Sequence, residues 1–338
     1  MKREIDCLIA AGTEESIGPQ YLATSTILTL AKALAATGRK TAILVIDPAL
    51  DPGLVARDDS DGIVIYRSAR PISTLPALSV ALGRPRILIL PNQLTVYDVA
   101  QTPGLDATIW LGEDDLKPLG DRWLSAPFHL WADSRYVADV AGRLTQRPVE
   151  TVPPPLGPTL DQDALPPADP TCIAVVGARP RDGIALTLSL ARQRRDLRFI
   201  VADWPRLTTT ARQQFFALAA SCGNIDWRRP DGPTALLTAA ATAGVILVPA
   251  MEPIGHRDWI CQMRLAGRCL IGTDIGALPD LIGNPDRILP ATTPAALWLQ
   301  HLDRLRQATP TTAPAADSLI SSCAAIAARF LSEMPSSR

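Results

Sequence analysis

The stretch from residue 245 to residue 282 reads VILVPAMEPIGHRDWICQMRLAGRCLIGTDIGALPDLI. Its apolar start, Val245–Val248, predicts a buried strand that Pro249 ends. Glu252 and Gly255 follow at a predicted strand-to-helix junction, before a helix, a second apolar strand and a Gly/Pro-rich turn. In an open α/β sheet, small ligands bind at the carboxyl ends of the strands. A helix that begins there offers free N–H groups and a favourable dipole to an anion such as phosphate.

Length and composition favour a protein with two domains. The chain has 338 residues, of which 47% are hydrophobic, enough to build two full cores. The formal net charge of -1 at pH 7 gives no global electrostatic reason to expect nucleic acid or an anionic membrane as a partner. We therefore expect no nucleic-acid partner, whereas peripheral membrane contact stays open.

Cysteine usage and the lack of long apolar segments indicate a cytoplasmic protein. The six cysteines are scattered, without a C-x-x-C pair, which argues against a zinc site and for free thiols in a reducing compartment. The N-terminal sequence MKREIDCLIAAG lacks the apolar run of a signal peptide. No run of about 18 uninterrupted apolar residues occurs, so no membrane-spanning helix is expected.

Apolar strands alternate with helical stretches, the pattern of α/β domains in which helices cover both faces of a parallel sheet. The strands expected in the N-terminal half are Asp6–Ala11, Thr41–Ile46, Ile63–Tyr66, Ile87–Leu90, Ala107–Leu111 and Phe128–Ala132, with helices at Tyr21–Thr37 and Ser134–Arg143. The strands expected in the C-terminal half are Cys172–Val176, Arg198–Ala202, Ile225–Trp227, Val245–Val248 and Cys269–Ile271, with helices at Ile184–Arg192, Pro294–Gln307 and Ser318–Glu333.

A proline-rich segment separates the two halves. Residues 149–171 read VETVPPPLGPTLDQDALPPADPT, and such prolines do not fit helix interiors or central strands. We therefore expect an N-terminal α/β domain at 1–152, a linker at 153–170, a second α/β domain at 171–312 and a C-terminal helical segment at 313–338.

Four pieces of the C-terminal half resemble the donor-site signature of retaining GT-B-fold glycosyltransferases of the family-4 type. They are, in order, Leu247-Val248-Pro249, Glu252-Pro253-Ile254-Gly255, Ala266-Gly267 and the run from Thr273 to Asp280. The resemblance is good over residues 173–307, whereas the N-terminal half matches only in strand order. It implies two Rossmann-like α/β domains that face a central cleft, with the C-terminal helix packing back on the N-terminal domain.

The same resemblance implies an activity. Such enzymes move a sugar from a nucleotide-diphosphate-sugar donor to a hydroxyl of an acceptor, which can be a glycan, a lipid-linked molecule or a protein. Positive side chains and helix N-termini stabilise the diphosphate leaving group, so no metal and no further cofactor are expected. The donor base, donor sugar, acceptor and oligomeric state are left open, because specificity depends on pocket shape.

Glu252 is the strongest candidate for donor binding. In the resembling family this Glu contacts hydroxyls of the donor sugar, and the backbone just after it, here Ile254 and Gly255, approaches the sugar and diphosphate. A carboxylate accepts two hydroxyls at once in strong charge-assisted hydrogen bonds, and a glycine lets the backbone come close. The alternative interpretation of Glu252 is an exposed helix-cap residue. His256 is a candidate for facing the donor phosphates, with a surface residue of the first helical turn as the alternative.

The resembling family places a second Glu eight positions after the first, where it commonly binds the ribose of the nucleotide. Counted without gaps, that position is Ile260, which cannot accept a hydrogen bond through its side chain. Aligned backwards from Ala266-Gly267, the position is Gln262, whose amide can bond a ribose diol without charge. Asp258 is a further possibility. Each polar candidate has a surface residue of a helix as its alternative.

Two glycine-bounded loops complete the expected site. The loop from Gly177 to Gly183 resembles the family's Gly-Arg-x-x-x-x-Lys-Gly loop, but Asp182 stands at the Lys position and the loop is one residue short. Arg179 and Arg181 could supply the positive charge, since guanidinium groups grip phosphate in a bidentate fork; two solvated arginines are the alternative. In the N-terminal half, Gly12 and Gly18 bound a first loop that could approach the diphosphate and the acceptor.

The departures from the family pattern motivate a rival function. The sequence lacks the Lys and the second Glu of the family pattern. It also lacks the family's His, because residues 112–115 after the strand Ala107–Leu111 read GEDD. A glycosyltransferase-like binding or scaffold protein without catalysis is therefore the alternative to an active enzyme. A sugar-nucleotide epimerase of the same fold is a weaker rival, since more acidic and His residues would be expected in its cleft.

Overall fold

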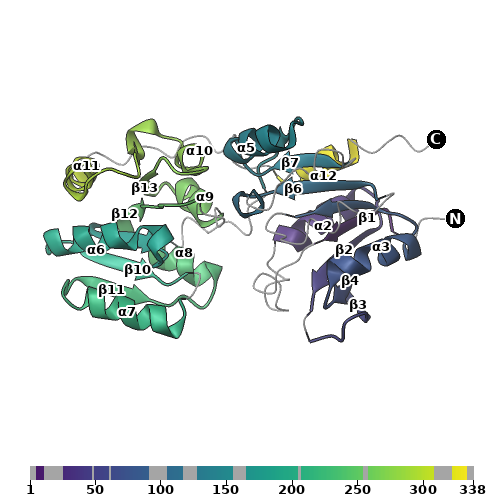
Figure 1. The fold of residues 1–338 in the computed structure, drawn as a ribbon, viewed down its shortest axis with the longest axis horizontal. Helices are drawn as coiled ribbons and strands as arrows, with labels where there is room; N and C mark the ends of the chain where they lie inside the picture. The colour runs from purple at the N-terminus through teal and green to yellow at the C-terminus, as the bar shows by residue number, and fades with distance from the viewer. Residues whose placement is uncertain are drawn as a thin grey trace. The chain divides into compact units, whose positions relative to one another are not determined.

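The computed structural model describes residues 5–10, 26–47, 49–60, 62–90, 105–116, 128–154, 165–204, 207–253, 258–307 and 322–332. Contacts divide the chain into two units: unit 1 is Met1–Pro158 together with Ile320–Arg338, and unit 2 is Thr159–Leu319. Each unit is built on one mainly parallel sheet with helices packed on it (Figure 1).

Among its described residues, unit 1 has an eight-stranded sheet in the order β3-β4-β2-β1-β5-β6-β7-β8. The hairpin of β3 and β4 is antiparallel, and the other neighbouring pairs are parallel. The strands are β1 (Cys7–Ala10), β2 (Thr41–Ile46), β3 (Val55–Ser60), β4 (Ile63–Ser68), β5 (Arg86–Ile89), β6 (Ala107–Leu111), β7 (His129–Ala132) and β8 (Glu150–Thr151). The described helices are α2 (Thr26–Ala36), α3 (Pro71–Ala81), α5 (Arg135–Thr145) and α12 (Cys323–Ser332), with the 3-10 turn η2 (Glu113–Asp115).

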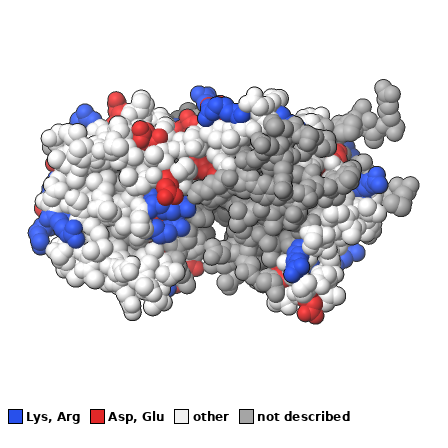
Figure 2. Space-filling view, in the orientation of Figure 1, with Lys and Arg blue, Asp and Glu red and all other residues white. Residues whose placement is uncertain are grey.

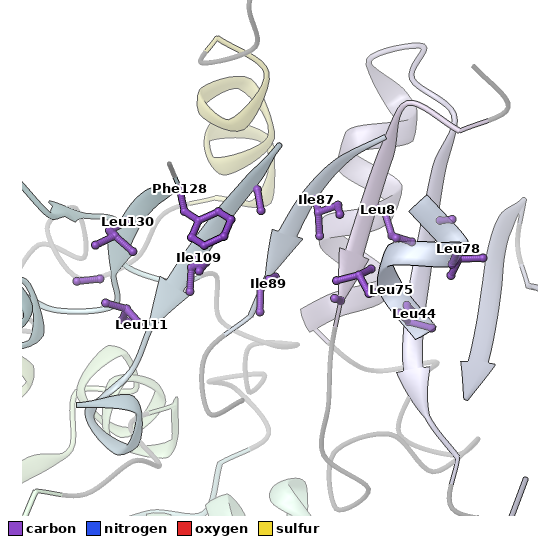
Figure 3. Packing of buried hydrophobic residues seen from close by; sticks show 14 of the residues in the cluster. Leu8, Leu44, Leu75, Leu78, Ile87, Ile89, Ile109, Leu111, Phe128 and Leu130 are labelled. Atoms are coloured by element: carbon purple, nitrogen blue, oxygen red, sulfur yellow. The ribbon is translucent and has the colours of Figure 1, made fainter. Parts of the chain in front are cut away.

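Both faces of this sheet are buried, so the strands are apolar at successive positions rather than at alternate ones. On one face, Leu8 and Leu44 pack in a core with Leu75 and Leu78 of α3 (Figure 3). The next residue of β1, Ile9, faces the opposite core together with α2 and α12.

The last helix packs on unit 1, as expected from the sequence. α12 lies against α2, and Phe330 of α12 is fully buried. Its ring meets Trp131 edge-on with the ring centroids 6.2 Å apart. The buried guanidinium of Arg86 donates from Nη1 to the carbonyl oxygen of Phe330 over 3.0 Å and lies over the Phe330 ring. These contacts confirm the predicted return of the C-terminal helix to the N-terminal half.

Among its described residues, unit 2 has a six-stranded sheet in the order β11-β10-β9-β12-β13-β14, with every neighbouring pair parallel. The strands are β9 (Asp169–Val176), β10 (Arg198–Ala202), β11 (Ile225–Arg228), β12 (Ala243–Val248), β13 (Cys269–Thr273) and β14 (Ile288–Leu289). The helices are α6 (Ile184–Gln193), α7 (Thr209–Ala219), α8 (Pro233–Ala241), α9 (Asp258–Leu265), α10 (Leu278–Ile282) and α11 (Ala295–Gln307), with the 3-10 turns η5 (Pro180–Asp182) and η6 (Pro285–Arg287).

The core of unit 2 fixes the sheet between its helices. Trp298 and Leu302 of α11 are fully buried and pack with α6 and with the inward side chains of β9, β10, β12 and β13. The helices lie on both faces of the sheet (Figure 1). Because the core clamps the strands along their length, the loops at the carboxyl ends of these strands start from fixed positions.

Three predicted strands have the observed bounds: Thr41–Ile46, Ala107–Leu111 and Arg198–Ala202. The helix expected at Tyr21–Thr37 is observed from Thr26 to Ala36, and its first predicted residues lie outside the described part of the chain. Strand β3 has no sequence signal of a buried strand, because VARDDS is charged and forms the edge of the sheet.

The strand expected from Cys172 begins earlier, at Asp169, and includes Pro170. The expectation that the prolines of this segment avoid central strands is therefore wrong for Pro170. The physical reason is local: the ladder with β12 shifts register between Ala243 and Val245, and the pairing with β10 begins only at Cys172. The missing N–H of Pro170 falls in this irregular part of β9.

Candidate functional site

The topology of unit 2 brings two of the predicted loops together. Numbered along the chain, its six described strands stand in the order 3-2-1-4-5-6, which reverses direction between β9 and β12. In such sheets ligands bind in the crevice outside the carboxyl ends of the strands at this switch point. The loop of residues 177–183 follows β9, and the loop that begins at Pro249 follows β12. The two loops are therefore neighbours at the position where a ligand is expected.

These two loops are joined by their backbones. The N–H of Met251 donates to the carbonyl oxygen of Arg181 over 2.8 Å. Gly183 has φ +77°, and a Cβ at this residue would lie 1.8 Å from the carbonyl oxygen of Pro249. Only glycine therefore fits here, both for its conformation and for the close approach of the second loop.

The Thr273-Asp274 part of the predicted signature also fixes backbone. The hydroxyl of Thr273, which is 1% exposed, donates to the carbonyl oxygen of Ala250 over 2.7 Å. The carboxylate of Asp274 accepts the N–H of Ala291 over 2.9 Å. The loop after β12 is thus held from the side of β9 and from the side of β13.

Asp182, which stands at the Lys position of the resembling loop, turns inward. It is 5% exposed, and its Oδ2 accepts the backbone N–H and the Nε–H of Arg179, both over 2.9 Å. Its Oδ1 accepts Nη2–H of the same arginine over 3.2 Å. Arg179 is therefore engaged by a carboxylate, and the structure does not place it as a free phosphate-binding group.

Arg181 has a different environment. Its Nε lies 4.0 Å from Asp182 Oδ1, beyond hydrogen-bond distance, and this buried Nε has no hydrogen-bond partner among the described residues. The side chain is 26% exposed. Figure 2 shows a small group of basic side chains beside one end of α6, with acidic atoms next to it. Of the two predicted arginines, Arg181 is the one whose guanidinium is not held by hydrogen bonds to Asp182.

Glu252 is exposed, directly after the joined part of the second loop. No hydrogen bond connects its carboxylate to another described residue, so it is available to a ligand. The other predicted residues of this loop, Ile254, Gly255 and His256, lie outside the described residues. The same holds for Gly12 and Gly18 of the first predicted loop.

The alternatives for the second acidic position differ in burial. Ile260 is fully buried in α9, so the ungapped alignment places a core residue there. Gln262, on the same helix, is 8% exposed, and its Oε1 is buried without a hydrogen-bond partner among the described residues. Asp258 is exposed in the first turn of α9. Gln262 and Asp258 thus both stay open as polar candidates, whereas Ile260 belongs to the core.

An open hollow of 620 Å³ lies at the other end of the predicted signature, lined by Arg264, Asp274, Pro279, Asp280, Gly283, Pro285, Ile288 and Pro290. The guanidinium of Arg264 donates from Nη1 to the carbonyl oxygens of Asp280, over 3.2 Å, and of Leu281, over 3.0 Å. Burial lowers the pKa of Arg264. Since this cation already satisfies the carboxyl-terminal carbonyls of α10, the switch point is the better candidate site.

Several buried acidic residues follow strands and were not singled out from the sequence. Asp203 follows β10 and is fully buried; its Oδ1 accepts the N–H of Leu207 over 2.7 Å, and Oδ2 lies 3.8 Å from Arg229 Nε. In unit 1, Glu113 and Asp115 after β6 are also buried. The sequence signal that could have identified these residues is an acidic residue shortly after a predicted strand of a parallel sheet.

Among the described residues, no group of three or more His, Cys, Asp and Glu side chains is arranged to hold a metal ion. In the same part of the chain, no helix has the length and apolar character needed to cross a membrane.

No family model matches the sequence, and no curated protein matches it. Solved structures do match the fold. Sucrose-phosphate synthase from Thermosynechococcus elongatus has a TM-score of 0.63 at 14% identity over 89% of each chain. A glycosyltransferase from Rickettsia africae has a TM-score of 0.63 at 11% identity, over 97% of this chain and 93% of that one. HepE from Anabaena, in complex with UDP and glucose, has a TM-score of 0.63 at 11% identity, over 96% of this chain and 95% of that one. This likeness shows that the chain has the GT-B fold of these glycosyltransferases.

Proposed function

We propose that the protein is a retaining glycosyltransferase of the family-4 type, which moves a sugar from a nucleotide-diphosphate sugar to an acceptor hydroxyl. One observation carries the proposal: at the switch point, the loop with Arg181 is joined to the loop with the exposed Glu252. This places a guanidinium and a carboxylate on neighbouring loops, as a ligand with a diphosphate and a sugar requires. The UDP and glucose in the Anabaena structure give independent support for such a ligand in this fold.

Each residue has a chemical role in this proposal. The Glu252 carboxylate accepts hydroxyls of the donor sugar in charge-assisted hydrogen bonds. The Arg181 guanidinium neutralises the diphosphate as it leaves, which stabilises the transition state more than the ground state. The Gln262 amide bonds the ribose diol. Ile254, Gly255 and His256 approach the sugar and the phosphates.

The partners follow from the same proposal. The donor is a substrate, and no metal or further cofactor is proposed. Gly12 and Gly18 bound the loop on the acceptor side, and the acceptor is a glycan, a lipid-linked molecule or a protein, as in polysaccharide, glycolipid or protein glycan synthesis. A cytoplasmic location, with peripheral membrane contact for a lipid-linked acceptor, agrees with these substrates.

A thermal-shift screen against UDP, GDP, ADP, TDP and CMP tests the donor site. We expect one nucleoside diphosphate to raise the melting temperature, because a ligand that binds only the folded state stabilises it. If none of the five shifts the midpoint, the proposed donor site is wrong.

The role of Glu252 is tested by Glu252→Ala. Removal of the carboxylate should weaken binding of the sugar nucleotide about 10- to 100-fold, the loss expected for a charged hydrogen-bond acceptor, and should leave the bare nucleoside diphosphate nearly unaffected. Isothermal titration with both ligands measures the difference. Asp196→Ala, an exposed carboxylate before β10 at the opposite end of the sheet, is the control. Equal losses for both ligands would contradict contact with the sugar.

A sugar-nucleotide-binding protein without catalysis is the second candidate function. The inward Asp182 at the Lys position and the buried Ile260 at the ungapped Glu position favour it. 31P NMR can monitor conversion of the bound sugar nucleotide to nucleoside diphosphate, with and without candidate acceptors. This measurement distinguishes an active enzyme from a binding protein. Release of the diphosphate supports the enzyme, and binding without any release supports the binding protein.

A further inference from the structure

We propose that Asp182 is a positioning residue: it holds the guanidinium of Arg179 by hydrogen bonds and leaves Arg181 as the cation that meets the donor diphosphate. The inference rests on the proposed function and deepens it, because it gives Arg179 a structural role and Arg181 the contact with the diphosphate. It also explains how an acidic residue can stand at the Lys position of the loop.

The hydrogen bonds between Asp182 and Arg179 form a closed set. The carboxylate accepts one backbone and two guanidinium donors of Arg179, over 2.9, 2.9 and 3.2 Å. In return, the N–H of Asp182 donates to the carbonyl oxygen of Arg179 over 3.0 Å. A bidentate pair of this kind fixes the direction of the guanidinium as well as its distance. Arg179 is therefore a structural part of the turn η5.

Gly177 provides the space for this arrangement. A Cβ at Gly177 would lie 2.5 Å from Asp182 Cγ and from Oδ2, and the residue has φ +93°. The loop thus begins with a glycine that admits the buried carboxylate and ends with Gly183, which admits the second loop. The inward position of Asp182 is built into the backbone at both ends.

Arg181 carries the net positive charge of the loop. Residues 177–183 contain two arginines and one aspartate, and pairing of Arg179 with Asp182 leaves one positive charge. The carbonyl of Arg181 is held by the N–H of Met251, so the base of its side chain is fixed beside the Glu252 loop. Its Nε has no hydrogen-bond partner among the described residues. In the proposal the diphosphate meets the terminal Nη groups of this guanidinium, because the Nε itself is buried.

The main experiment compares Arg179→Gln/Asp182→Asn with Arg181→Gln. The double variant removes the pair of Arg179 and Asp182 and keeps the net charge of the loop, whereas Arg181→Gln removes the proposed contact. Binding of inorganic pyrophosphate and of the nucleoside diphosphates is measured by titration at several salt concentrations, since salt screens exposed charge–charge contacts.

We expect the double variant to lose about threefold to tenfold in affinity, because the hydrogen-bonded pair that positions the loop is gone. Its salt dependence should stay that of the wild type, because the net charge of the loop is unchanged. Arg181→Gln should weaken binding about 10- to 100-fold and flatten the salt dependence. If the double variant loses as much affinity as Arg181→Gln and its salt dependence flattens equally, Arg179 contacts the diphosphate itself and the inference is wrong.

Asp182→Asn alone provides a second test that does not require the double variant to fold. The amide still accepts the N–H of Arg179, but loss of the carboxylate charge leaves the guanidinium of Arg179 without its ion pair and raises the net charge of the loop by one. We expect a steeper salt dependence of pyrophosphate binding, a change that a purely structural role would not produce. An unchanged salt dependence would overturn the inference.

The outcomes also separate this inference from the proposed function. If the variants change pyrophosphate binding as expected but no sugar nucleotide binds or turns over, the inference stands and the proposed function falls. If sugar nucleotides turn over but the double variant behaves like Arg181→Gln, only the inference falls. If wild-type protein binds neither pyrophosphate nor any nucleoside diphosphate, both are wrong.

Discussion

The two ends of the unit 2 sheet use the same kinds of side chain for different purposes. At the amino ends of the strands, Arg194 is paired with the half-exposed Asp303 and with Asp196 at 2.7 Å, so the carboxylates of these ion pairs are exposed to solvent. At the carboxyl ends, Asp182 is buried and fixes backbone as well as a guanidinium. An exposed pair can be lost at little cost, whereas a buried one determines a shape. The difference identifies the carboxyl end as the end whose geometry is specified.

The largest expected effect comes from Gly183→Ala, matched with Gly223→Ala. Both glycines have positive φ, +77° and +74°, but only Gly183 has backbone within 4 Å of an added Cβ. The control at the amino end of β11 should cost about 1–2 kcal/mol for the left-handed conformation alone. Gly183→Ala should cost about 2–5 kcal/mol, since overpacking against Pro249 is added. Urea unfolding of both variants measures the difference, and equal losses would show that the loops are not closely packed.

The second largest effect is expected for Arg181→Gln, with Arg195→Gln as its matched control. Arg195 precedes β10 and donates to the carbonyl oxygen of Ser221 over 3.3 Å. Loss of a charged hydrogen bond to phosphate, worth about 1.5–3 kcal/mol, should weaken nucleoside diphosphate binding about 10- to 100-fold for Arg181→Gln. Arg195→Gln should leave binding unchanged. A similar loss in both variants, seen by titration, would indicate a general charge effect instead of a site at the carboxyl end.

Thr273→Val and Thr171→Val test the same contrast with neutral hydrogen bonds. Thr273 bonds the carbonyl of Ala250 in a buried position, so its replacement should cost about 1–2 kcal/mol. Thr171 bonds Asp169 in an exposed position, so its replacement should cost no more than about 0.5 kcal/mol. Urea unfolding measures both. A larger cost for Thr171→Val would reverse the comparison.

The smallest effect is a pH dependence at the amino end. A hydrogen bond from Arg194 lowers the pKa of Asp196 to about 2 from an ordinary value of 3.8. For an acid with a depressed pKa, the stabilisation is present above the unfolded-state pKa and is lost as the pH falls through the folded-state pKa. Asp196→Asn should therefore show a slightly smaller drop in melting temperature between pH 5 and pH 2 than wild type. The same drop in both proteins would show that this exposed pair contributes nothing.

Much of the fold could be predicted because it depends on buried, apolar strands. Strands such as Ala107–Leu111 and Arg198–Ala202 have a continuous or nearly continuous apolar run, which a parallel sheet with two covered faces requires. The edge strand β3 could not be found in this way, because its charged residues are stabilised by pairing with β4 alone. Pro170 misled the prediction because it falls in an irregular part of β9, where Asp169 and Ile173 pair with Ala243 and Val245 of β12.

The candidate site was predictable in its position but not in its bonding. Glu252 and the loop of residues 177–183 were identified by their resemblance to family motifs and by their places after strands, and the strand order then made them neighbours. The sequence treats Arg179 and Arg181 alike, since both are arginines on one loop. Only the structure distinguishes them, because the inward turn of Asp182 depends on the space at Gly177 and on the bond from Met251 to Arg181.

The return of α12 to unit 1 has a consequence for the modularity of the chain. Unit 2 is one continuous insertion between two pieces of unit 1, so it is connected to its host at both of its ends. A fragment that ends near residue 158 would leave Trp131 and Arg86 without the Phe330 contacts that cover them. A fragment that spans unit 2 would keep its whole core. We therefore expect unit 2 to fold as a separate fragment, whereas unit 1 needs the C-terminal helix α12 to complete its core.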